Sequence, residues 1–113
     1  MKLKKISINK WIKALKSGYY KQGAGYLLKV GKYCCLGVAY QIAGYPKDKI
    51  IGQALPSDVD DTPNESKGLL GMKLRYSMND LSEFNDGSSN YEHHTFKEIA
   101  KVLLGEMKPK RKL

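Results

Sequence analysis

The sequence of 113 residues predicts a small single α+β domain, with three to four helices around a small antiparallel sheet or hairpin. Both ends of the chain show the first sign of this, because apolar residues recur there at helical spacing. Strand-like runs at 26–30 and 72–76 are the second sign. The third is the uncharged, apolar stretch 33–44, which predicts a central core helix that ends at Gly44.

The two terminal helices carry the clearest boundary signals. Ser7 is a residue type that caps helix N-termini, so the first helix is expected to begin after it and to end at Gly18. Trp11 lies in the apolar stripe of this helix, which favours a core position over a binding role. Thr95 and Glu98 form the capping-box pattern and predict the start of the last helix.

The first strand and its hairpin are predicted from a glycine-containing turn. Gly31 and Lys32 fit a tight two-residue turn between the run 26–30 and the residues that follow Lys32. After the core helix, the segment 45–68 has the proline content of a loop and contains the acidic run 58–61. We therefore expect irregular structure between the core helix and the second strand-like run.

The second half of the chain is predicted to end in a basic segment. A short helix is expected at 78–84, followed by an Asn-Asp-Gly turn at 85–87. Five of the last six residues before the final leucine are lysine, arginine or proline, so we divide the chain into a domain, 1–107, and a basic C-terminal tail, 108–113.

Positive charge dominates the first half of the chain. Lys and Arg total 20 against 11 Asp and Glu, and no acid precedes Asp48. Such a balance favours an anionic partner, such as nucleic acid, a nucleotide or an acidic protein surface. The alternative is genome composition, because all but two of the basic residues are lysine and arginine is the better reader of phosphate.

The adjacent cysteines indicate a reduced chain, since neighbouring residues form only a strained disulfide. Unpaired cysteines are usually buried apolar residues, so we expect this pair to fill the core. The alternative is an enzyme in which one of the thiols is the nucleophile. The two cysteines and two histidines are adjacent pairs without the spacing of a zinc site, so no metal or cofactor is expected. The residues of that alternative are Cys34 or Cys35 as nucleophile, His93 or His94 as base, and Asn85 or Asp86 as orienting group.

The candidate ligand-binding site combines tyrosines, lysines and amide side chains around two turns. Tyrosine rings can stack on a planar ligand while lysines neutralise phosphate, a combination suited to a nucleotide-like molecule. The residues assigned to this site are Tyr19, Tyr20, Lys21, Gln22, Lys32, Tyr33, Asn85 and Asp86.

Four sequence blocks resemble a family of small uncharacterised phage-encoded proteins. The blocks are a Trp-containing helix at 11–18, a Tyr-Lys-Gln-Gly turn at 20–23 with Gly25 and Leu27, a Tyr-Cys-Cys-Leu-Gly-Val core at 33–38, and the segment 81–86, which enters the Asn-Asp-Gly turn, with a Phe-x-x-Ile-Ala helix at 96–100. Residues 89–94 are extra relative to the family pattern at this last junction. The resemblance implies a phage origin, a small α+β fold and a place in the host cytoplasm, and it transfers no catalytic residue.

These observations favour a non-enzymatic binding module that captures an anionic partner, such as a nucleotide-type signal of host defence. Three alternatives remain: non-specific nucleic-acid binding through surface lysines, inhibition of a host protein, and, least favoured, a cysteine-dependent hydrolase. The segregated charge also predicts a homo-oligomer, in which the basic half of one copy meets the acidic segment of another. The chain has no apolar run of membrane-spanning length, so we expect no membrane partner.

Overall fold

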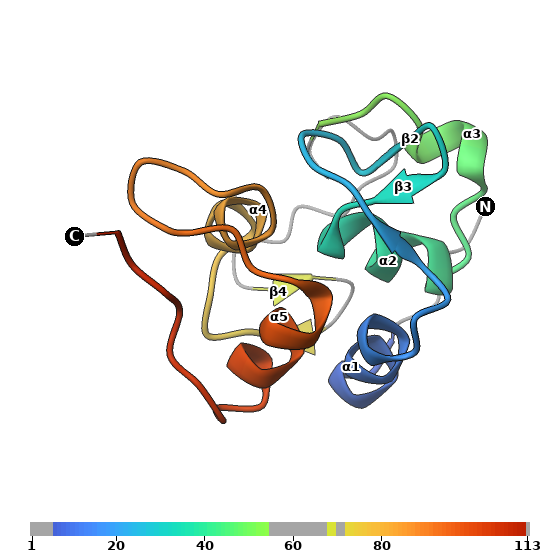
Figure 1. Ribbon diagram of the computed structural model, residues 1–113. Coiled ribbons are helices and arrows are strands. Elements are labelled where there is room, and N and C mark those ends of the chain that lie inside the picture. Colours follow the sequence, from blue (N-terminus) through green and yellow to red (C-terminus); the bar gives the residue numbers. More distant parts are fainter. Residues whose placement is uncertain (1–5, 55–67, 70–71, 113) are drawn as a thin grey trace.

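A computed structural model describes residues 6–54, 68–69 and 72–112, and the predicted α+β fold is confirmed. Helices pack around one core beside a small sheet, as Figure 1 shows. The acidic run 58–61 lies outside the described residues. The elements are α1 (Ile8–Lys16), β1 (Lys21–Gln22), β2 (Leu28–Lys29), β3 (Lys32–Tyr33), α2 (Cys35–Ile42), α3 (Lys47–Ile50), β4 (Gly68–Leu69), β5 (Met72–Lys73), α4 (Met78–Asp86) and α5 (Phe96–Leu103).

The predicted core helix is confirmed as α2, which contacts both α1 and α4. Trp11 of α1 is fully buried, and its indole nitrogen donates a hydrogen bond of 2.9 Å to the carbonyl of Cys35. Gly37 lets α2 approach the backbone of Leu27, the residue that precedes β2, because a Cβ atom there would lie 1.8 Å from the carbonyl oxygen of Leu27. Gly44 follows the helix end with φ +104°, the left-handed conformation expected of it.

The three-stranded sheet is mixed, whereas the sequence predicted an antiparallel pair. Its order is β1-β3-β2, with β1 parallel and β2 antiparallel to β3. Paired residues point to the same face, so the register produces two rows of side chains. The outer, exposed row is Lys21, Lys32 and Lys29, and the inner row is Gln22, Tyr33 and Leu28.

The hairpin turn between β2 and β3 lies one residue earlier than predicted. Because Lys29 pairs with Lys32, the two turn residues are Val30 and Gly31, and Lys32 belongs to the strand. Both turn residues have positive φ, 52° and 76°, which is the pattern of a type I′ turn. The sequence prediction placed glycine first because glycine is the usual residue at positive φ.

Three further elements differ from their predicted bounds. The helix α3 lies in the segment expected to be a loop, and it buries Ile50. The helix α4 continues through two of the three predicted turn residues and ends at Gly87, which has φ +80°. It begins with a capping box between Ser77 and Asp80, and β5 pairs with β4 over only part of the predicted strand.

The basic segment assigned to a tail lies along the loop that precedes α5 (Figure 1). The backbone N–H of Glu92 donates to the carbonyl of Lys110, and that of Lys112 donates to the carbonyl of Asn90, both at 2.9 Å. His94 accepts a further hydrogen bond of 2.8 Å at Nε2 from the backbone N–H of Lys110. Backbone bonds therefore anchor this segment to the domain.

Candidate anion-binding groove

A groove opens beside the three-stranded sheet and α3. These elements lie at the upper right of Figure 1. Its volume is about 600 Å³, which is in the usual range for small-molecule sites. The approach to β1, the β2–β3 turn, β3, α2 and α3 all contribute to its wall. The lining residues are Tyr19, Tyr20, Lys21, Val30, Gly31, Lys32, Tyr33, Gln41 and Lys47.

The groove is positively charged. Lys21, Lys32 and Lys47 line it, and its lining contains no acidic residue. Among the described residues, none of the three forms a salt bridge, because the ion pair found there joins Lys110 to Glu98. The groove is therefore lined by three lysines that form no salt bridge within the described part of the protein.

The sheet register sets lysines side by side at the edge of this groove. Lys21 and Lys32 are direct partners across β1 and β3, and adjacent strands lie about 4.8 Å apart. Lys29 continues the row on β2, and its ammonium group lies 4.3 Å from the ring centroid of Tyr26. Like charges directly opposite each other destabilise a sheet, so a bound anion would relieve this repulsion.

Three tyrosines form an aromatic wall in the groove. Tyr19 and Tyr20 meet edge to face with centroids 4.9 Å apart, and Tyr20 meets Tyr33 in the same way at 5.1 Å. Tyr33 is buried, and its hydroxyl donates a hydrogen bond of 3.0 Å to the side-chain carbonyl of Gln41. Tyr19 is 81% exposed, so its ring is accessible for stacking.

Two of these tyrosine hydroxyls have a pKa that burial raises above its ordinary value. Burial raises the pKa of Tyr20 and of Tyr33 above 10, and the neighbouring tyrosines raise both further. Neutral hydroxyls add no negative charge to the groove and can still donate hydrogen bonds. The tyrosine wall is therefore compatible with an anionic ligand at neutral pH.

The structure divides the predicted site residues between two places. Five of the eight line the groove, and the other three lie around a buried junction behind the sheet. The groove also contains residues that the sequence analysis did not assign, among them Val30, Gln41 and Lys47. Of these three, only Lys47 could have been assigned from the sequence, because it belongs to the acid-free first part of the chain whose positive charge predicted an anionic partner.

Gln22 is the first member of the buried junction, and its side-chain amide joins β1 to α4 and α5. Its amide nitrogen donates to Asn85 Oδ1 at 3.0 Å and to the carbonyl of His94 at 2.8 Å. Its amide oxygen accepts a bond of 3.0 Å from the backbone N–H of Phe96, the first residue of α5. Gln22 thus satisfies one of the N–H groups that a helix start leaves without an internal partner.

Asn85 is the second member, and it is fully buried. Its side-chain oxygen also accepts a bond of 3.1 Å from the backbone N–H of Cys35, the first residue of α2. Its amide nitrogen donates at 2.8 Å to both the carbonyl of Gly23 and Asp86 Oδ1. Because all four of its hydrogen-bonding positions are in use, Asn85 connects the helices and has no free group for a ligand.

The cysteines lack the features of a nucleophile at neutral pH. Both are buried as predicted, and Cys34 Sγ accepts the N–H of Gly37 at 3.4 Å. Burial raises the pKa of Cys34 to about 11 and raises that of Cys35 as well, so neither is a thiolate. The candidate base His94 is fully buried, with Nδ1 2.7 Å from the carbonyl of Glu92 and Nε2 bound to a backbone N–H.

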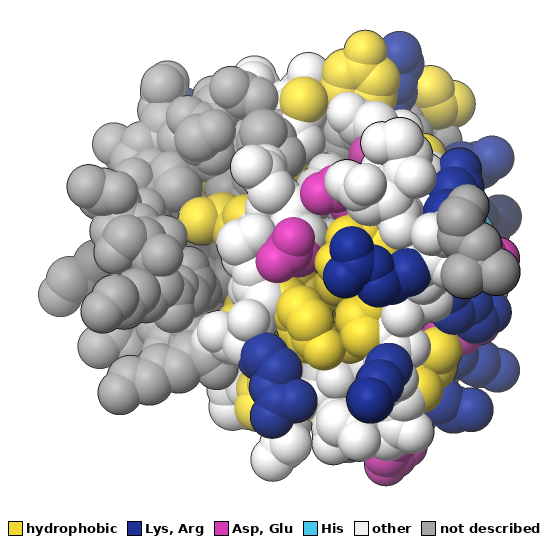
Figure 2. All heavy atoms as spheres, turned by 90° about the vertical axis from the view of Figure 1, so that its left-hand side faces the viewer, with side chains coloured by type: hydrophobic (Ala, Val, Ile, Leu, Met, Phe, Trp, Pro, Cys, Tyr) yellow, Lys and Arg dark blue, Asp and Glu magenta, His cyan; other side chains and the backbone are white. Residues whose placement is uncertain are grey.

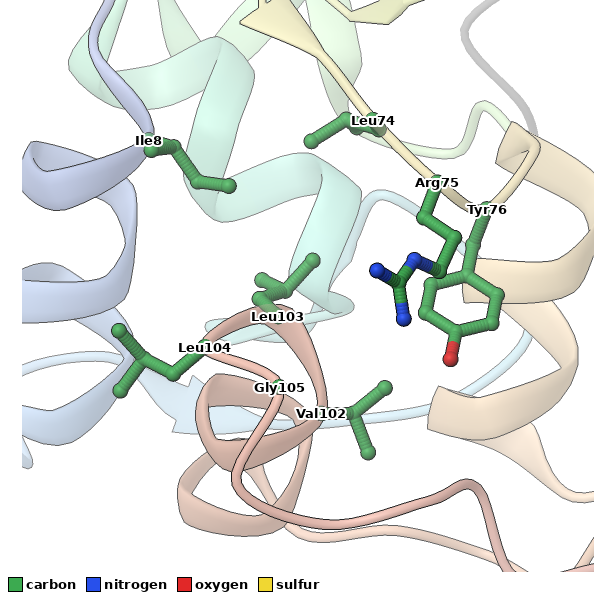
Figure 3. A pocket seen from close by; sticks show the side chains of 8 residues that line it. All are labelled: Ile8, Leu74, Arg75, Tyr76, Val102, Leu103, Leu104 and Gly105. Carbon is green, nitrogen blue, oxygen red and sulfur yellow. The ribbon is translucent and has the colours of Figure 1, made fainter.

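A second, smaller cavity of about 250 Å³ lies between α1, the segment 74–76 and the end of α5. Figure 3 shows the guanidinium group of Arg75 pointing into it beside the ring of Tyr76. Leucine, isoleucine and valine side chains form most of the remaining wall. One basic residue lines this cavity, whereas three line the groove, so the cavity is less suited to a multiply charged anion.

Basic side chains are widespread on the surface. Figure 2 shows the face that lies on the left in Figure 1, where Lys and Arg side chains outnumber Asp and Glu and crowd one edge. Such a field attracts anions over a range of distances, and the groove would bind them at a defined place. None of the described helices has the length and apolar content needed to cross a membrane.

Comparison with known families gives one match. A family model described as a domain of unknown function (DUF8296) is similar to residues 2–53 of this chain. The similar segment contains every groove residue, whereas α4 and α5 lie beyond it. No curated protein and no solved structure matches the chain.

Proposed function

We propose that this protein is a non-enzymatic binding protein whose groove captures an anionic small molecule of the nucleotide type. The observation that carries the proposal is the combination of unpaired lysines with an exposed tyrosine ring in one groove. A nucleotide needs these two features together, because it carries phosphates at one end and a planar base at the other.

The groove residues divide naturally between the two parts of such a ligand. Lys21 and Lys32, which are register partners, and Lys47 supply ammonium groups for the phosphates. Tyr19 supplies a ring face for the base, since stacking on tyrosine is tolerant of the base identity. The groove lining contains no cysteine, serine, threonine, histidine or acidic residue, and the described residues include no group of three or more His, Cys, Asp or Glu side chains that could hold a metal ion. The proposal therefore requires binding alone.

Non-specific nucleic-acid binding is the second candidate, and the surface of α1 favours it. Lys10, Lys13 and Lys16 are exposed on this helix, which contains no acidic residue. Dispersed lysines of this kind contact successive phosphates, and the resulting affinity falls steeply as salt increases. The two candidates therefore involve different lysines and can be separated by mutation.

The resemblance to phage-encoded proteins suggests a biological setting for the first candidate. A small protein made in an infected host could sequester a nucleotide signal of the host defence and so prevent its action. Binding without chemistry would suffice, provided that the protein is made in excess over the signal.

Calorimetric titration with ADP, a cyclic dinucleotide and a short oligonucleotide tests the proposal. The double variant Lys21→Gln with Lys32→Gln should weaken nucleotide binding by about a hundredfold or more, because it removes two charged hydrogen bonds that are each worth about 1.5 kcal/mol or more. The matched control, Lys10→Gln with Lys13→Gln, should leave nucleotide binding unchanged and weaken the oligonucleotide. The proposal fails if the native protein binds neither nucleotide at micromolar concentration.

A further inference from the structure

Val30 occupies a position that the fold alone does not explain. It is the first residue of the β2–β3 turn, where φ is +52°, and among the described residues it is the one non-glycine residue with positive φ. A branched side chain is a genuine outlier in this conformation. The side chain is also 85% exposed, so an apolar group faces water at a strained position.

Another residue type would fit the first position of this turn with less backbone strain. Type I′ turns favour Asn-Gly, because asparagine tolerates the left-handed conformation and glycine follows without strain. Gly31 already supplies the second residue of that pair. Val30 lies outside the apolar core, so packing does not compensate for the strain.

The place of Val30 in the groove offers an explanation. It lines the groove together with Tyr19, which is 81% exposed. These are the two most exposed large apolar side chains in the described part of the chain, and both lie in the same groove. Strained residues that the surrounding structure tolerates tend to occur at binding sites.

We infer that Val30 is a specificity-determining residue, which contacts the base of a bound nucleotide together with the ring of Tyr19. The inference rests on the proposed function, because it assigns the base end of the ligand whose phosphates meet the lysines. A base is flat and apolar on its faces, so the valine methyl groups and a tyrosine ring are both suitable contacts for it.

The variant Val30→Asn separates the turn from the ligand. It creates the favoured Asn-Gly pair, so the melting temperature should rise by a few degrees. Affinity for ADP should nevertheless fall by about tenfold, the range expected for loss of a contact with a base. Inorganic pyrophosphate carries the phosphates without a base, so its affinity should stay within about twofold of the native value. The matched control Val30→Ile keeps a branched apolar side chain and should keep the ADP affinity.

Each possible result bears on the inference. Unchanged ADP affinity in Val30→Asn would overturn it, and so would an equal loss for pyrophosphate, which would indicate a general disturbance of the groove. A lowered melting temperature would remove the argument from the turn. If native protein binds pyrophosphate and ADP equally well, the groove takes anions but the base contact is wrong. If it binds neither, the proposed function and the inference fail together.

Discussion

The polar side chains on the two faces of the small sheet differ in whether they have partners within the protein. On the inner face, the amide of Gln22 has protein partners for both its nitrogen and its oxygen. On the outer face, Lys21 and Lys32 have no ion-pair partner among the described residues. Lys21 and Gln22 are neighbours in the sequence, so one pair of strands supports both arrangements.

The difference separates the polar groups on which folding depends from those that are free of protein partners. A buried polar group destabilises the protein unless it is hydrogen-bonded, so the inner amides have to be satisfied by other parts of the fold. Exposed lysines make no such demand and remain available for a ligand. Substitutions on the inner side should therefore change the free energy of unfolding, and those on the outer side should change affinity.

The largest expected effect is that of Gly37→Ala, where α2 lies against the backbone of Leu27. The new methyl carbon would lie 1.8 Å from the carbonyl oxygen of Leu27, so α2 and the segment before β2 would have to separate. We expect a loss of about 3 kcal/mol or more in the free energy of unfolding, measured by urea denaturation. Gly25→Ala is the control, because its φ of +84° is unfavourable but no neighbour lies within 4 Å. It should cost about 1 kcal/mol, and equal losses for both variants would contradict the packing argument.

A somewhat smaller effect is expected from Asn85→Ala, in the buried junction. The substitution would leave the backbone N–H of Cys35 and the carbonyl of Gly23 without their partner, at a cost of about 3 kcal/mol. Asn79→Ala, on the exposed surface of the same helix, should change stability by less than about 0.5 kcal/mol. Folded Asn85→Ala protein should bind anions with native affinity, and a selective loss of that affinity would show that the junction belongs to the site.

The smallest expected effect belongs to the exposed pair of Glu98 and Lys110. A hydrogen bond from the Lys110 ammonium group, followed by one from the backbone of Thr95, lowers the pKa of Glu98 from 4.5 to about 2. Because the folded-state pKa is the lower one, the pair stabilises the protein above about pH 4.5 and loses this effect as the pH falls towards 2. The variant Glu98→Gln keeps a capping residue and removes the charge.

Melting curves of the native protein and Glu98→Gln between pH 7 and pH 2 test this assignment. The native protein should melt slightly higher at pH 7, since exposed ion pairs contribute little. The difference should shrink as Glu98 becomes protonated, and a difference that stays constant across this range would exclude the carboxylate as its source.

The sequence predicted the elements whose signals are local. Ser7, Thr95 and Glu98 form the caps expected of them, and Trp11 is buried, because capping and helical periodicity depend on residues a few positions apart. The hairpin was predicted as well, but its turn was displaced by one residue. That register depends on which strands pair, and a shift of one residue reverses every side chain between the two faces.

The residues of the groove and of the junction were likewise predicted correctly only where the signal is local in the sequence. Tyr19, Tyr20 and Lys21 are adjacent in the sequence, and a composition argument was enough to group them. The sequence also grouped Gln22 and Asn85 with the ligand residues. In the structure, the amides of these two residues instead hydrogen-bond to groups of the protein. These bonds join α4 to β1 and the residue after it, which are far apart in the sequence, so the sequence alone did not predict them.

The junction has a consequence for the order in which the chain folds. Every groove residue lies between positions 19 and 47, so the groove is built from contacts that are close in sequence. Gln22, by contrast, bonds to residues that follow it by 63, 72 and 74 positions. Closing such long loops is slow, so the hairpin should form early and the helix starts at Cys35 and Phe96 should acquire their side-chain partners late. A nascent chain can thus form the groove before α4 and α5, which hold Gln22 in place, have been synthesised.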